Sequence, residues 1–406
     1  MSKKYIKRAL ESVLKKAGHE FPAVVLTGPR QSGKTTLLKH LFGNSHRYVS
    51  LEPPDIRASA ETDPRGFLDT YPAPVIFDEI QYAPTLLPYI KEHIDAHRDK
   101  KGQYLLTGSQ NILMTEHITE SLAGRAAMLK LLPLSQREIF GCPDATLPWE
   151  KGHTASHQHT SSNQLWNCFL RGGYPELVAD TERDIYLWHS SYIQTYLERD
   201  IRTLRQVGDL TTFQNFLRAL AARNGQLLNL TEMARDLGVA VNTAKAWISV
   251  LEATFQIIVL RPYFGNLNKR LVKSPKIYFT DLGTLCYLAG LKDPDHAASG
   301  PMGGSIFETA VLMEIIKTIV HRGEEAQVYF WRTATGVEVD VIIEVQGKLI
   351  PIEVKLSATP KPAMAEGIRI FQTDFLSKAS SGFVITPGST RLPLGNGIIA
   401  LPFGEL

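Results

Sequence analysis

The chain has 406 residues, enough for two or three compact domains, and its hydrophobic fraction of 44% allows each domain a sizeable core. The formal net charge of +3 is too small to indicate a nucleic-acid-binding protein by itself, so any basic surface must be local. The three cysteines form no C-x-x-C pair, which argues against a disulfide framework and a zinc site. No run reaches about 18 apolar residues and the amino-terminal segment lacks the apolar core of a signal peptide, so we expect a cytoplasmic protein without membrane contact.

Residues 22–140 alternate short apolar runs with helical stretches, which predicts a mostly parallel sheet with helices between its strands. Continuous apolar runs are typical of strands that are buried on both faces. The predicted strands are AVVLTG, YVSL, VIFDE, YLLTGS and AMLKLLPL. We therefore expect residues 1–165 to form an α/β domain.

A glycine-rich motif follows the first of these strands. GPRQSGKTT matches the pattern G-x-x-x-x-G-K-[ST] and opens a helical stretch, which is the context of a phosphate-binding loop. Its glycines let backbone N–H groups surround a phosphate, and the helix amino terminus adds positive potential. We expect Lys34 to neutralise the β- and γ-phosphates of ATP and the Thr35 hydroxyl to bind Mg²⁺. The predicted nucleotide-binding residues are Gly28, Pro29, Arg30, Gln31, Ser32, Gly33, Lys34, Thr35 and Thr36.

An acidic pair ends the strand VIFDE. Asp78 at the strand tip would hold Mg²⁺, and Glu79 beside it would activate the attacking water. Such a pair by itself could equally cap a helix. The phosphate loop upstream favours a site for nucleoside triphosphate.

Two further polar residues are candidates for the same site. Ser109, which we favour over Thr107, follows the strand YLLTG and would contact the γ-phosphate or the lytic water, although strand-end hydroxyls also serve as caps. Arg125 precedes the next strand and would stabilise transition-state charge, either in cis or from a neighbouring subunit of a homo-oligomer. The alternative for Arg125 is a structural ion pair.

The chain resembles a large family of bacterial and archaeal AAA-type ATPases that carry a C-terminal domain of unknown function. The motifs that carry the resemblance are GPRQSGKTT, FDEIQ, LLTGS, LAGR, PLSQREIF, RGGYPELV and YLERDI. The resemblance covers nearly the whole chain. It implies an AAA-type ATP-binding fold in which Lys34, Thr35, Asp78 and Glu79 take the family's phosphate and metal roles.

The middle of the chain changes character twice. Residues 141–163 are polar and aperiodic, which predicts an exposed loop whose histidines at 153, 157 and 159 are solvated rather than metal ligands. Residues 166–225 then have the apolar spacing of helices and would extend the ATPase domain.

Residues 226–292 have the pattern of a winged helix-turn-helix module. Asn229 and Glu232 resemble a capping box, Gly238 would occupy the turn, and residues 242–251 would form the second helix. The runs FQIIVL and KIYFTD would form a wing. Between and beside them lies a strip of cations suited to DNA phosphates, namely Arg261, Lys269, Arg270, Lys273 and Lys276. Winged helices also act as packing modules, so DNA contact is one of two alternatives.

The last part of the chain carries a second set of charged residues. GVEVDVIIE and KLIPIEVKL read as strands joined by a turn at residues 346–347. Alternation puts Glu353 and Lys355 on one face, and hairpin pairing would bring Asp340 near Glu353. Carboxylates there would bind Mg²⁺, Lys355 would orient a hydroxide, and Glu308 in the preceding helix would complete the site.

This arrangement resembles the core of PD-(D/E)XK nucleases, in which a helical Glu precedes an Asp and an E-x-K strand. The resemblance assigns the helical Glu to Glu308, the Asp to Asp340 and the E-x-K pair to Glu353 and Lys355. Val339 stands where the family name has proline. The alternatives are ion pairs on a sheet surface, and a nuclease fold that binds nucleic acid without cutting it.

The predicted organisation is therefore an ATPase core at 1–165, a helical extension at 166–225, a winged-helix module at 226–292, a linker at 293–305 and a restriction-endonuclease-like α/β domain at 306–406. The expected activity is ATP hydrolysis with Mg²⁺. The alternatives are a slow nucleotide-dependent switch that controls DNA or protein binding, and an ATP-dependent DNA nuclease.

Overall fold

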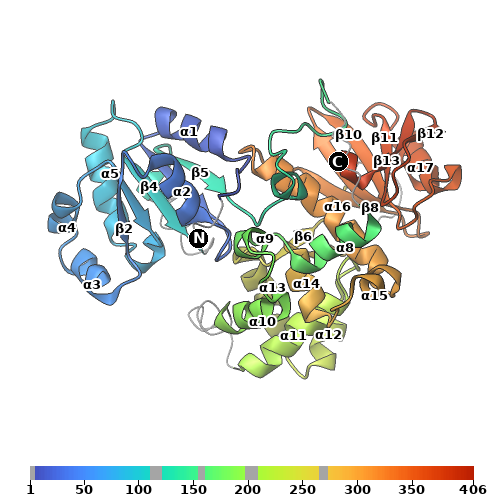
Figure 1. Ribbon diagram of the computed structural model, residues 1–406, viewed down its shortest axis with the longest axis horizontal. Coiled ribbons are helices and arrows are strands. Elements are labelled where there is room, and N and C mark those ends of the chain that lie inside the picture. Colours follow the sequence, from blue (N-terminus) through green and yellow to red (C-terminus); the bar gives the residue numbers. More distant parts are fainter. Residues whose placement is uncertain (1–4, 110–120, 154–160, 197–208, 265–272) are drawn as a thin grey trace.

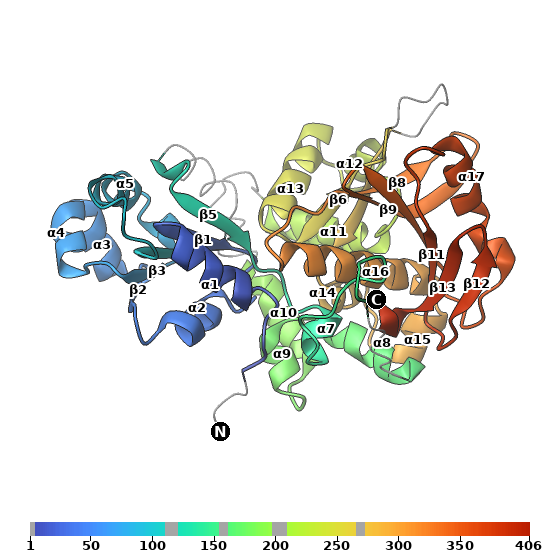
Figure 2. The same cartoon turned by 90° about the horizontal axis from the view of Figure 1, so that it is seen from above.

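The computed structural model describes residues 5–109, 121–153, 161–196, 209–264 and 273–406. The chain folds into an amino-terminal α/β part, a helical middle part and a carboxyl-terminal part built on a mixed sheet (Figure 1). A long helix, α16 (Gly303–Val320), lies between the two sheets in both views (Figure 1, Figure 2). No helix within the described ranges is long and apolar enough to cross a membrane.

The amino-terminal part contains the five parallel strands that the sequence predicts. They are β1 (Ala23–Thr27), β2 (Arg47–Ser50), β3 (Val75–Asp78), β4 (Tyr104–Gly108) and β5 (Ala126–Lys130). Their order in the sheet is β2-β3-β4-β1-β5, and every neighbouring pair is parallel. Strands β1, β3 and β4 are buried at every position because helices cover both faces. Those helices are α1 (Glu11–Glu20), α2 (Lys34–Phe42), α3 (Pro54–Thr62), α4 (Pro64–Thr70) and α5 (Leu86–Ala96).

The middle part is mainly helical and ends in a short hairpin and two more helices. Its helices are α7 (Gln136–Ile139), α8 (Ser162–Arg171), α9 (Pro175–Ala179), α10 (Ile185–Tyr196), α11 (Leu210–Ala222), α12 (Leu230–Asp236), α13 (Val241–Ala253), α14 (Leu282–Leu288) and α15 (Pro294–Ser299). The hairpin pairs β6 (Ile257–Leu260) with β7 (Lys276–Phe279) in antiparallel fashion. Helix α12 begins as the sequence indicates, since the Asn229 side chain accepts a hydrogen bond from the Glu232 amide, 3.2 Å.

The carboxyl-terminal part packs α16 and a second helix, α17 (Glu366–Asp374), against a mixed sheet. The strands are β8 (Val328–Arg332), β9 (Glu338–Val345), β10 (Lys348–Val354), β11 (Gly382–Thr386), β12 (Leu392–Gly395) and β13 (Ile398–Pro402). Their order is β12-β13-β11-β10-β9-β8, with β8, β9 and β10 antiparallel and β11 parallel to β10. The predicted hairpin turn is confirmed, because Gln346 and Gly347 have φ angles of 51° and 75° that suit a two-residue turn.

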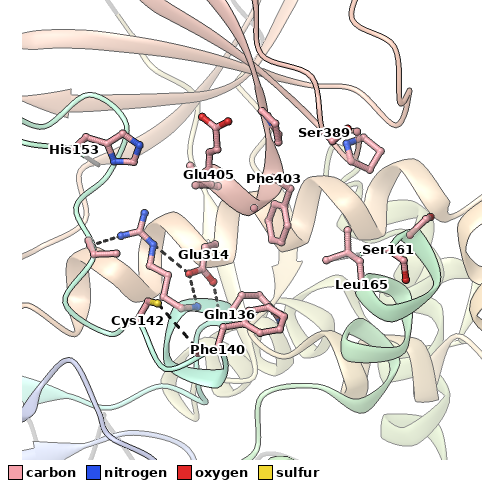
Figure 3. A pocket seen from close by; sticks show the side chains of 18 of the residues that line it. Gln136, Phe140, Cys142, His153, Ser161, Leu165, Glu314, Ser389, Phe403 and Glu405 are labelled. Carbon is pink, nitrogen blue, oxygen red and sulfur yellow. Dashed lines mark hydrogen bonds and ion pairs between the residues drawn. The ribbon is translucent and has the colours of Figure 1, made fainter. Parts of the chain in front are cut away.

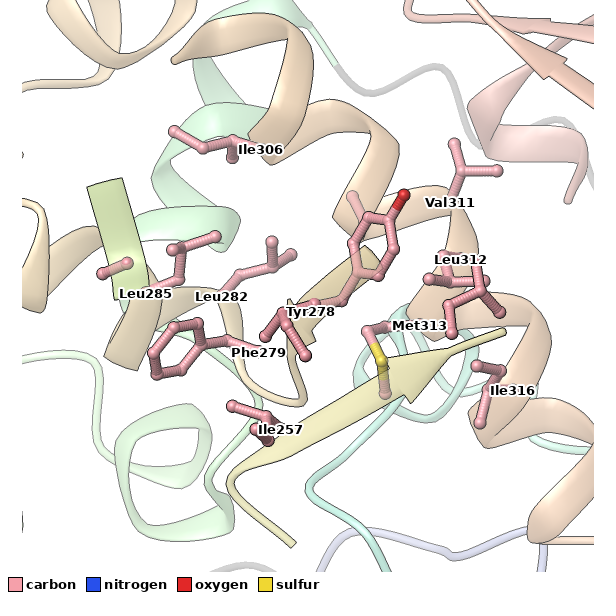
Figure 4. Packing of buried hydrophobic residues seen from close by; sticks show 14 of the residues in the cluster. Ile257, Tyr278, Phe279, Leu282, Leu285, Ile306, Val311, Leu312, Met313 and Ile316 are labelled. Carbon is pink, nitrogen blue, oxygen red and sulfur yellow. The ribbon is translucent and has the colours of Figure 1, made fainter. Parts of the chain in front are cut away.

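One hydrophobic cluster joins the middle part to the carboxyl-terminal sheet. It runs from Leu132 to Leu406 and includes most of the buried face of α16. Figure 4 shows how Ile306 and Met313 of α16 pack beside Tyr278 of β7 and Leu285 of α14. The two parts therefore share a core.

Two segments differ from the sequence-based expectation. Residues 293–305 are not an irregular linker, because they contain α15 and the start of α16, and Ala297 is buried in the shared core. The described portion of 141–163 is not simply exposed, since Leu147 is buried and Glu150 pairs with Arg322 at the end of α16, 2.6 Å. His153 lies here, whereas histidines 157 and 159 fall outside the described residues.

Candidate functional site

The phosphate-loop motif lies at the carboxyl edge of the amino-terminal sheet. It connects β1 to α2, and Gly33 and Gln31 adopt φ angles of 95° and 60° that bend the backbone around the turn. The Ser32 side chain is fully buried, and its hydroxyl has no hydrogen-bond partner among the described residues. The remaining motif residues, Gly28, Pro29, Arg30 and Thr36, lie on the same turn or on the first turn of α2.

Lys34 closes over this loop. Its ammonium donates hydrogen bonds to the carbonyl oxygens of Gly28 and Pro29, both at 2.9 Å, and the residue is only 5% exposed. An ammonium with three donors on a flexible stem can exchange carbonyl partners for phosphate oxygens. The structure thus holds the predicted phosphate-binding cation at the mouth of the loop.

Asp78 stands at the tip of β3 beside the start of α2. Its carboxylate accepts hydrogen bonds from the Thr35 hydroxyl, 2.8 Å, and from the Tyr48 hydroxyl, 2.8 Å, and it also contacts the Thr107 hydroxyl. These donors hold the carboxylate in one orientation. The Thr35 hydroxyl and the Asp78 carboxylate together present oxygen ligands of the kind that Mg²⁺ prefers.

Glu79 follows Asp78 in a left-handed conformation, with φ and ψ of 60° and 52°. Its amide donates to the Thr107 hydroxyl, 3.0 Å, and its carboxylate contacts the Gln81 side chain. Gln81 in turn donates to the Ser109 hydroxyl, 3.2 Å. Ser109 therefore reaches Glu79 through Gln81, whereas Thr107 contacts Asp78 and Glu79 directly.

The sequence-based preference for Ser109 over Thr107 was incomplete, because both hydroxyls lie at the carboxyl edge of the sheet and form hydrogen bonds in the candidate nucleotide site. Their spacing of two residues on or beside β4 places them on one face of the strand, which was a usable signal. Tyr48 and Gln81 were missed, since neither belongs to a recognised spacing pattern.

Arg125 lies at the opposite edge of the sheet. It precedes β5, whose first residue pairs with Ala23 at the start of β1, so about five residues of strand, roughly 16 Å, separate it from the phosphate loop. Its guanidinium forms a two-point ion pair with Asp95 of α5, at 2.8 and 3.0 Å. This placement corrects the expectation of a catalytic role in cis, because the site lies beyond reach of the side chain.

Arg8, which the sequence did not single out, supports the phosphate loop from behind. The residue is 3% exposed, and its guanidinium donates to the carbonyl oxygens of Ser32, 2.9 Å, and Leu132, 2.7 Å. Pro175 Cγ also approaches the loop, 3.5 Å from the position that a Cβ atom on Gly33 would take. The amino-terminal segment and the start of α9 therefore both pack against the loop.

A cavity in the carboxyl-terminal part brings together the charged residues predicted in the last part of the chain. Glu308, Asp340, Glu353 and Lys355 all line one pocket of about 620 Å³ between α16, β9, β10 and the middle part. Asp340 accepts a hydrogen bond from the amide of Val354, 2.8 Å, and Lys355 forms an ion pair with Glu353, 2.5 Å.

Lys276 and Glu338 also line this pocket, and the sequence did not place them there. Lys276 Nζ lies 3.0 Å from Glu308 and 2.5 Å from Glu338. We expected Lys276 to belong to an exposed DNA-binding strip, but it is 4% exposed and points into an acidic cavity. That expectation is wrong because the spacing of cations in a sequence does not show which of them will be exposed to solvent.

In the same predicted strip Arg261 and Lys273 are exposed, whereas residues 269 and 270 lie outside the described ranges.

The carboxyl groups of the cavity are hard to ionise. Burial and the neighbouring Asp340 raise the pKa of Glu353 to about 8 and that of Glu308 to about 7, while Lys355 and Lys276 oppose these shifts. Burial also raises the pKa of Asp340. No group of three or more His, Cys, Asp or Glu side chains within the described parts of the chain lies close enough together to hold a metal ion.

Another cavity, of about 430 Å³, lies where α7, α8 and the chain end meet (Figure 3). Its polar groups pair across the junction, since Glu314 of α16 accepts hydrogen bonds from the amides of Gln136, 2.7 Å, and Arg137, 3.2 Å. No predicted site residue lines it. These contacts fasten α7 to α16.

The second helix of the predicted winged module presents a polar face. In α13, Asn242, Lys245 and Ser249 are exposed, whereas Ala244 and Trp247 are buried against the rest of the module. The segment that follows β6 also contacts the carboxyl-terminal sheet, since the Tyr263 amide donates to the Phe330 carbonyl, 2.7 Å. The module is therefore docked on the last part of the chain.

Comparison with protein families divides the chain into three matches. Residues 20–140 match an AAA domain, residues 162–295 match a domain of unknown function (DUF8612), and residues 303–406 match another domain of unknown function (DUF4143). The amino-terminal part is thus an AAA-type ATPase domain with an α/β fold and a parallel sheet. A solved Walker-type ATPase of Pyrococcus abyssi is similar over 70% of this chain and 96% of its own, at 15% identity and a TM-score of 0.46.

Two curated proteins are similar over almost the whole chain. They are the uncharacterized proteins Rv2008c of Mycobacterium tuberculosis and Mb2031c of Mycobacterium bovis. Each is 30% identical over 396 residues, which covers 97% of this chain and 82% of the mycobacterial protein. The chain, an AAA domain followed by two domains of unknown function, therefore belongs to the same protein family as these mycobacterial proteins.

Proposed function

We propose that this protein binds ATP with Mg²⁺ and hydrolyses it at the carboxyl edge of the amino-terminal sheet. The observation that carries the proposal is the contact between Thr35 and Asp78, because it joins the phosphate loop to the acidic end of β3. Glu79 lies one residue beyond, on the same edge. A helix amino terminus, a loop lysine and two carboxylates in this order are suited to phosphoryl transfer to water.

Each residue has a role that follows from its chemistry. Lys34 would leave the carbonyls of Gly28 and Pro29 to neutralise the terminal phosphates, and the unpartnered Ser32 hydroxyl would gain an acceptor. Thr35 and Asp78 would hold Mg²⁺, which supplies charge neutralisation on the phosphate oxygens. Glu79 would accept the proton of the attacking water, with Gln81 and Ser109 holding its carboxylate in place.

The first test compares Lys34→Ala with Lys16→Ala. Lys16 is exposed on α1 and serves as the matched control. Binding of a fluorescent ATP analogue and release of phosphate would both be measured. We expect Lys34→Ala to lose binding or turnover and Lys16→Ala to keep both, and normal turnover in Lys34→Ala would contradict the proposal.

The rate of basal turnover separates an enzyme from a nucleotide switch. Phosphate release would be measured with and without DNA. Rapid hydrolysis by the protein alone favours an ATPase that acts continuously. Slow hydrolysis that changes on adding DNA favours a switch that uses its nucleotide state to control binding.

A second candidate function concerns the acidic cavity of the carboxyl-terminal part. We propose that it is a metal-dependent phosphodiester site of the PD-(D/E)XK nuclease type, favoured by the convergence of Glu308, Asp340, Glu353 and Lys355 on one pocket. The two carboxylates on β9 and β10 would bind the metal ion, and Lys355 would offset charge on the phosphate. DNA would be presented by the exposed face of α13, with residues 226–292 acting as a winged helix.

A cleavage assay tests this second function. Linear, nicked and single-stranded DNA would be incubated with the protein, ATP and either Mg²⁺ or Mn²⁺, alongside Asp340→Ala. Metal-dependent cutting that disappears in the variant supports a nuclease. Retention of DNA in a binding assay without cutting of any substrate would leave a nucleic-acid-binding fold.

A further inference from the structure

The acidic cavity contains a cation that comes from another part of the chain. Lys276 is the first residue of β7, in the middle part, whereas Glu308, Glu338, Asp340 and Glu353 belong to the carboxyl-terminal part. Its ammonium contacts Glu308 at 3.0 Å and Glu338 at 2.5 Å. The side chain is 5% exposed, so these carboxylates rather than water solvate it.

The charges of the cavity show what Lys276 contributes. The described residues that line it carry four carboxylates, namely those of Glu308, Glu338, Asp340 and Glu353, and three cations, Lys276, Arg332 and Lys355. Without Lys276 the formal charge falls from −1 to −2, which a single divalent cation would neutralise. The carboxylates of Glu308 and Glu338 supply the counterions that a buried ammonium requires.

The cavity also has an unused acceptor beside the Lys276 contacts. Glu353 is 7% exposed, and its Oε2 atom has no hydrogen-bond partner among the described residues. A buried carboxylate oxygen without a partner is costly unless a ligand satisfies it. Asp340 faces the same space, and its Oδ2 atom accepts a hydrogen bond from the Val354 amide, 2.8 Å.

We propose that Lys276 is an internal cation that keeps a divalent metal ion out of this cavity, so that metal binding requires β7 to withdraw it. This inference rests on the proposed role of the cavity as a metal-dependent phosphodiester site. With the ammonium in place, Glu308 and Glu338 are arranged around Nζ rather than around Asp340 and Glu353. The middle part thus holds the carboxyl-terminal site in an inhibited form.

Mn²⁺ titration of the full-length chain tests the proposal. Isothermal titration calorimetry and Mn²⁺ electron paramagnetic resonance would be applied to wild type, Lys276→Gln and the double variant Lys276→Gln/Asp340→Ala. Lys273→Gln is the matched control, because Lys273 is exposed three residues earlier. We expect Lys276→Gln to bind Mn²⁺ at least about tenfold more tightly than wild type, a difference of about 1.4 kcal/mol, and the double variant to bind none.

A thermal melt provides a second readout. Removing Lys276 leaves buried carboxylates without their counterion, so Lys276→Gln should melt lower than wild type in chelator and regain stability when Mn²⁺ is added. Should Lys276→Gln fail to fold, Lys276→Met takes its place. That variant also removes the ammonium, keeps all four carboxylates and fills the same space with an apolar side chain, and it should bind Mn²⁺ more tightly than wild type.

The outcomes are distinguishable from one another. Equal Mn²⁺ affinity in wild type and in the Lys276 variants would overturn the role of Lys276 while leaving a metal site in place. An absence of Mn²⁺ binding in every protein would overturn both this inference and the metal-dependent site. Neither result bears on ATP hydrolysis, which depends on Lys34 and is measured separately.

Discussion

The guanidinium of Arg8 lies 3.0 Å from the carboxylate of Glu138 in a site that water does not reach. Glu138 Oε1 is also 3.2 Å from Nδ1 of His321, the residue that follows α16. Burial opposes the ionisation of Glu138, but Arg8 and His321 hold its pKa below the usual range. Since Arg8 also binds the Ser32 carbonyl, one carboxylate connects the phosphate loop to the helix that carries Glu308.

We predict that Glu138→Gln destabilises the protein by about 3–5 kcal/mol, because it leaves the Arg8 guanidinium buried without its anion. Urea denaturation followed by circular dichroism measures the change. Glu20→Gln is the control, since Glu20 forms only an exposed pair with Lys16, 3.9 Å. Equal stability of the two variants would show that the buried contact does not support the fold.

We predict that Thr107→Val lowers ATP turnover by about tenfold and stability by about 1–3 kcal/mol, because Asp78 loses a donor and the Glu79 amide loses its acceptor. Thr107→Ser keeps the hydroxyl and should keep both properties. Steady-state phosphate release and thermal melts distinguish the two. Wild-type turnover in Thr107→Val would mean that Asp78 and Glu79 are held by other contacts.

We predict that Arg125→Ala leaves the turnover of a dilute, monomeric sample unchanged, since Arg125 pairs with Asp95 at the edge opposite the phosphate loop. Arg98→Ala is the control, because Arg98 contacts the same carboxylate, 3.2 Å. Turnover would be measured over a range of protein concentrations. A loss confined to Arg125→Ala at high concentration would assign this arginine to the site of a neighbouring subunit.

The pH dependence of the protein's stability should reflect the raised pKa of Glu353 in the acidic cavity. Burial and Asp340 raise the pKa of Glu353 from 4.5 to about 8, so between these values the folded state binds more protons than the unfolded state. Stability should therefore fall as pH rises through this window, and the contribution of Glu353 should be lost completely above it. Glu353→Gln should show a shallower decline in melting temperature from about pH 5 to 8, whereas Glu344→Gln, on the same hairpin, should follow wild type. Parallel curves for all three proteins would contradict the shift.

Local sequence patterns were sufficient to predict much of the nucleotide site. Strand β1, the glycine turn and Asp78 at the tip of β3 follow from residues that are close together in the sequence. The same holds for the β9–β10 hairpin, whose two-residue turn places Asp340 and Glu353 just beyond the last pair of the ladder, Val341 with Ile352. In each case one periodicity and one turn determine which side chains share a face.

Contacts between distant segments could not be predicted in this way. Arg8 reaches Glu138 across 130 residues, and Lys276 enters a cavity built by strands more than sixty residues later. Both lie in stretches where cations look solvated, because nothing local shows which carboxylate will face them. The cis role expected for Arg125 was wrong although the signal was local, because Arg125 precedes a strand of a parallel sheet and therefore lies at the edge opposite the phosphate loop. Its ion pair with Asp95 matches the structural alternative.

Helix α16 limits where the chain can be divided into separately folding pieces. It is buried on nearly every side, and Glu308 on its second turn faces the acidic cavity. Further along, Glu314 and Lys317 form hydrogen bonds with the segment that follows β5. The family matches break at residues 295 and 303, yet the hydrophobic cluster crosses that break without interruption. A chain cut at this break would expose apolar surface on both pieces, because each piece would lose the other half of the shared core. We therefore expect the two domains of unknown function to fold only together, although the family boundaries separate them.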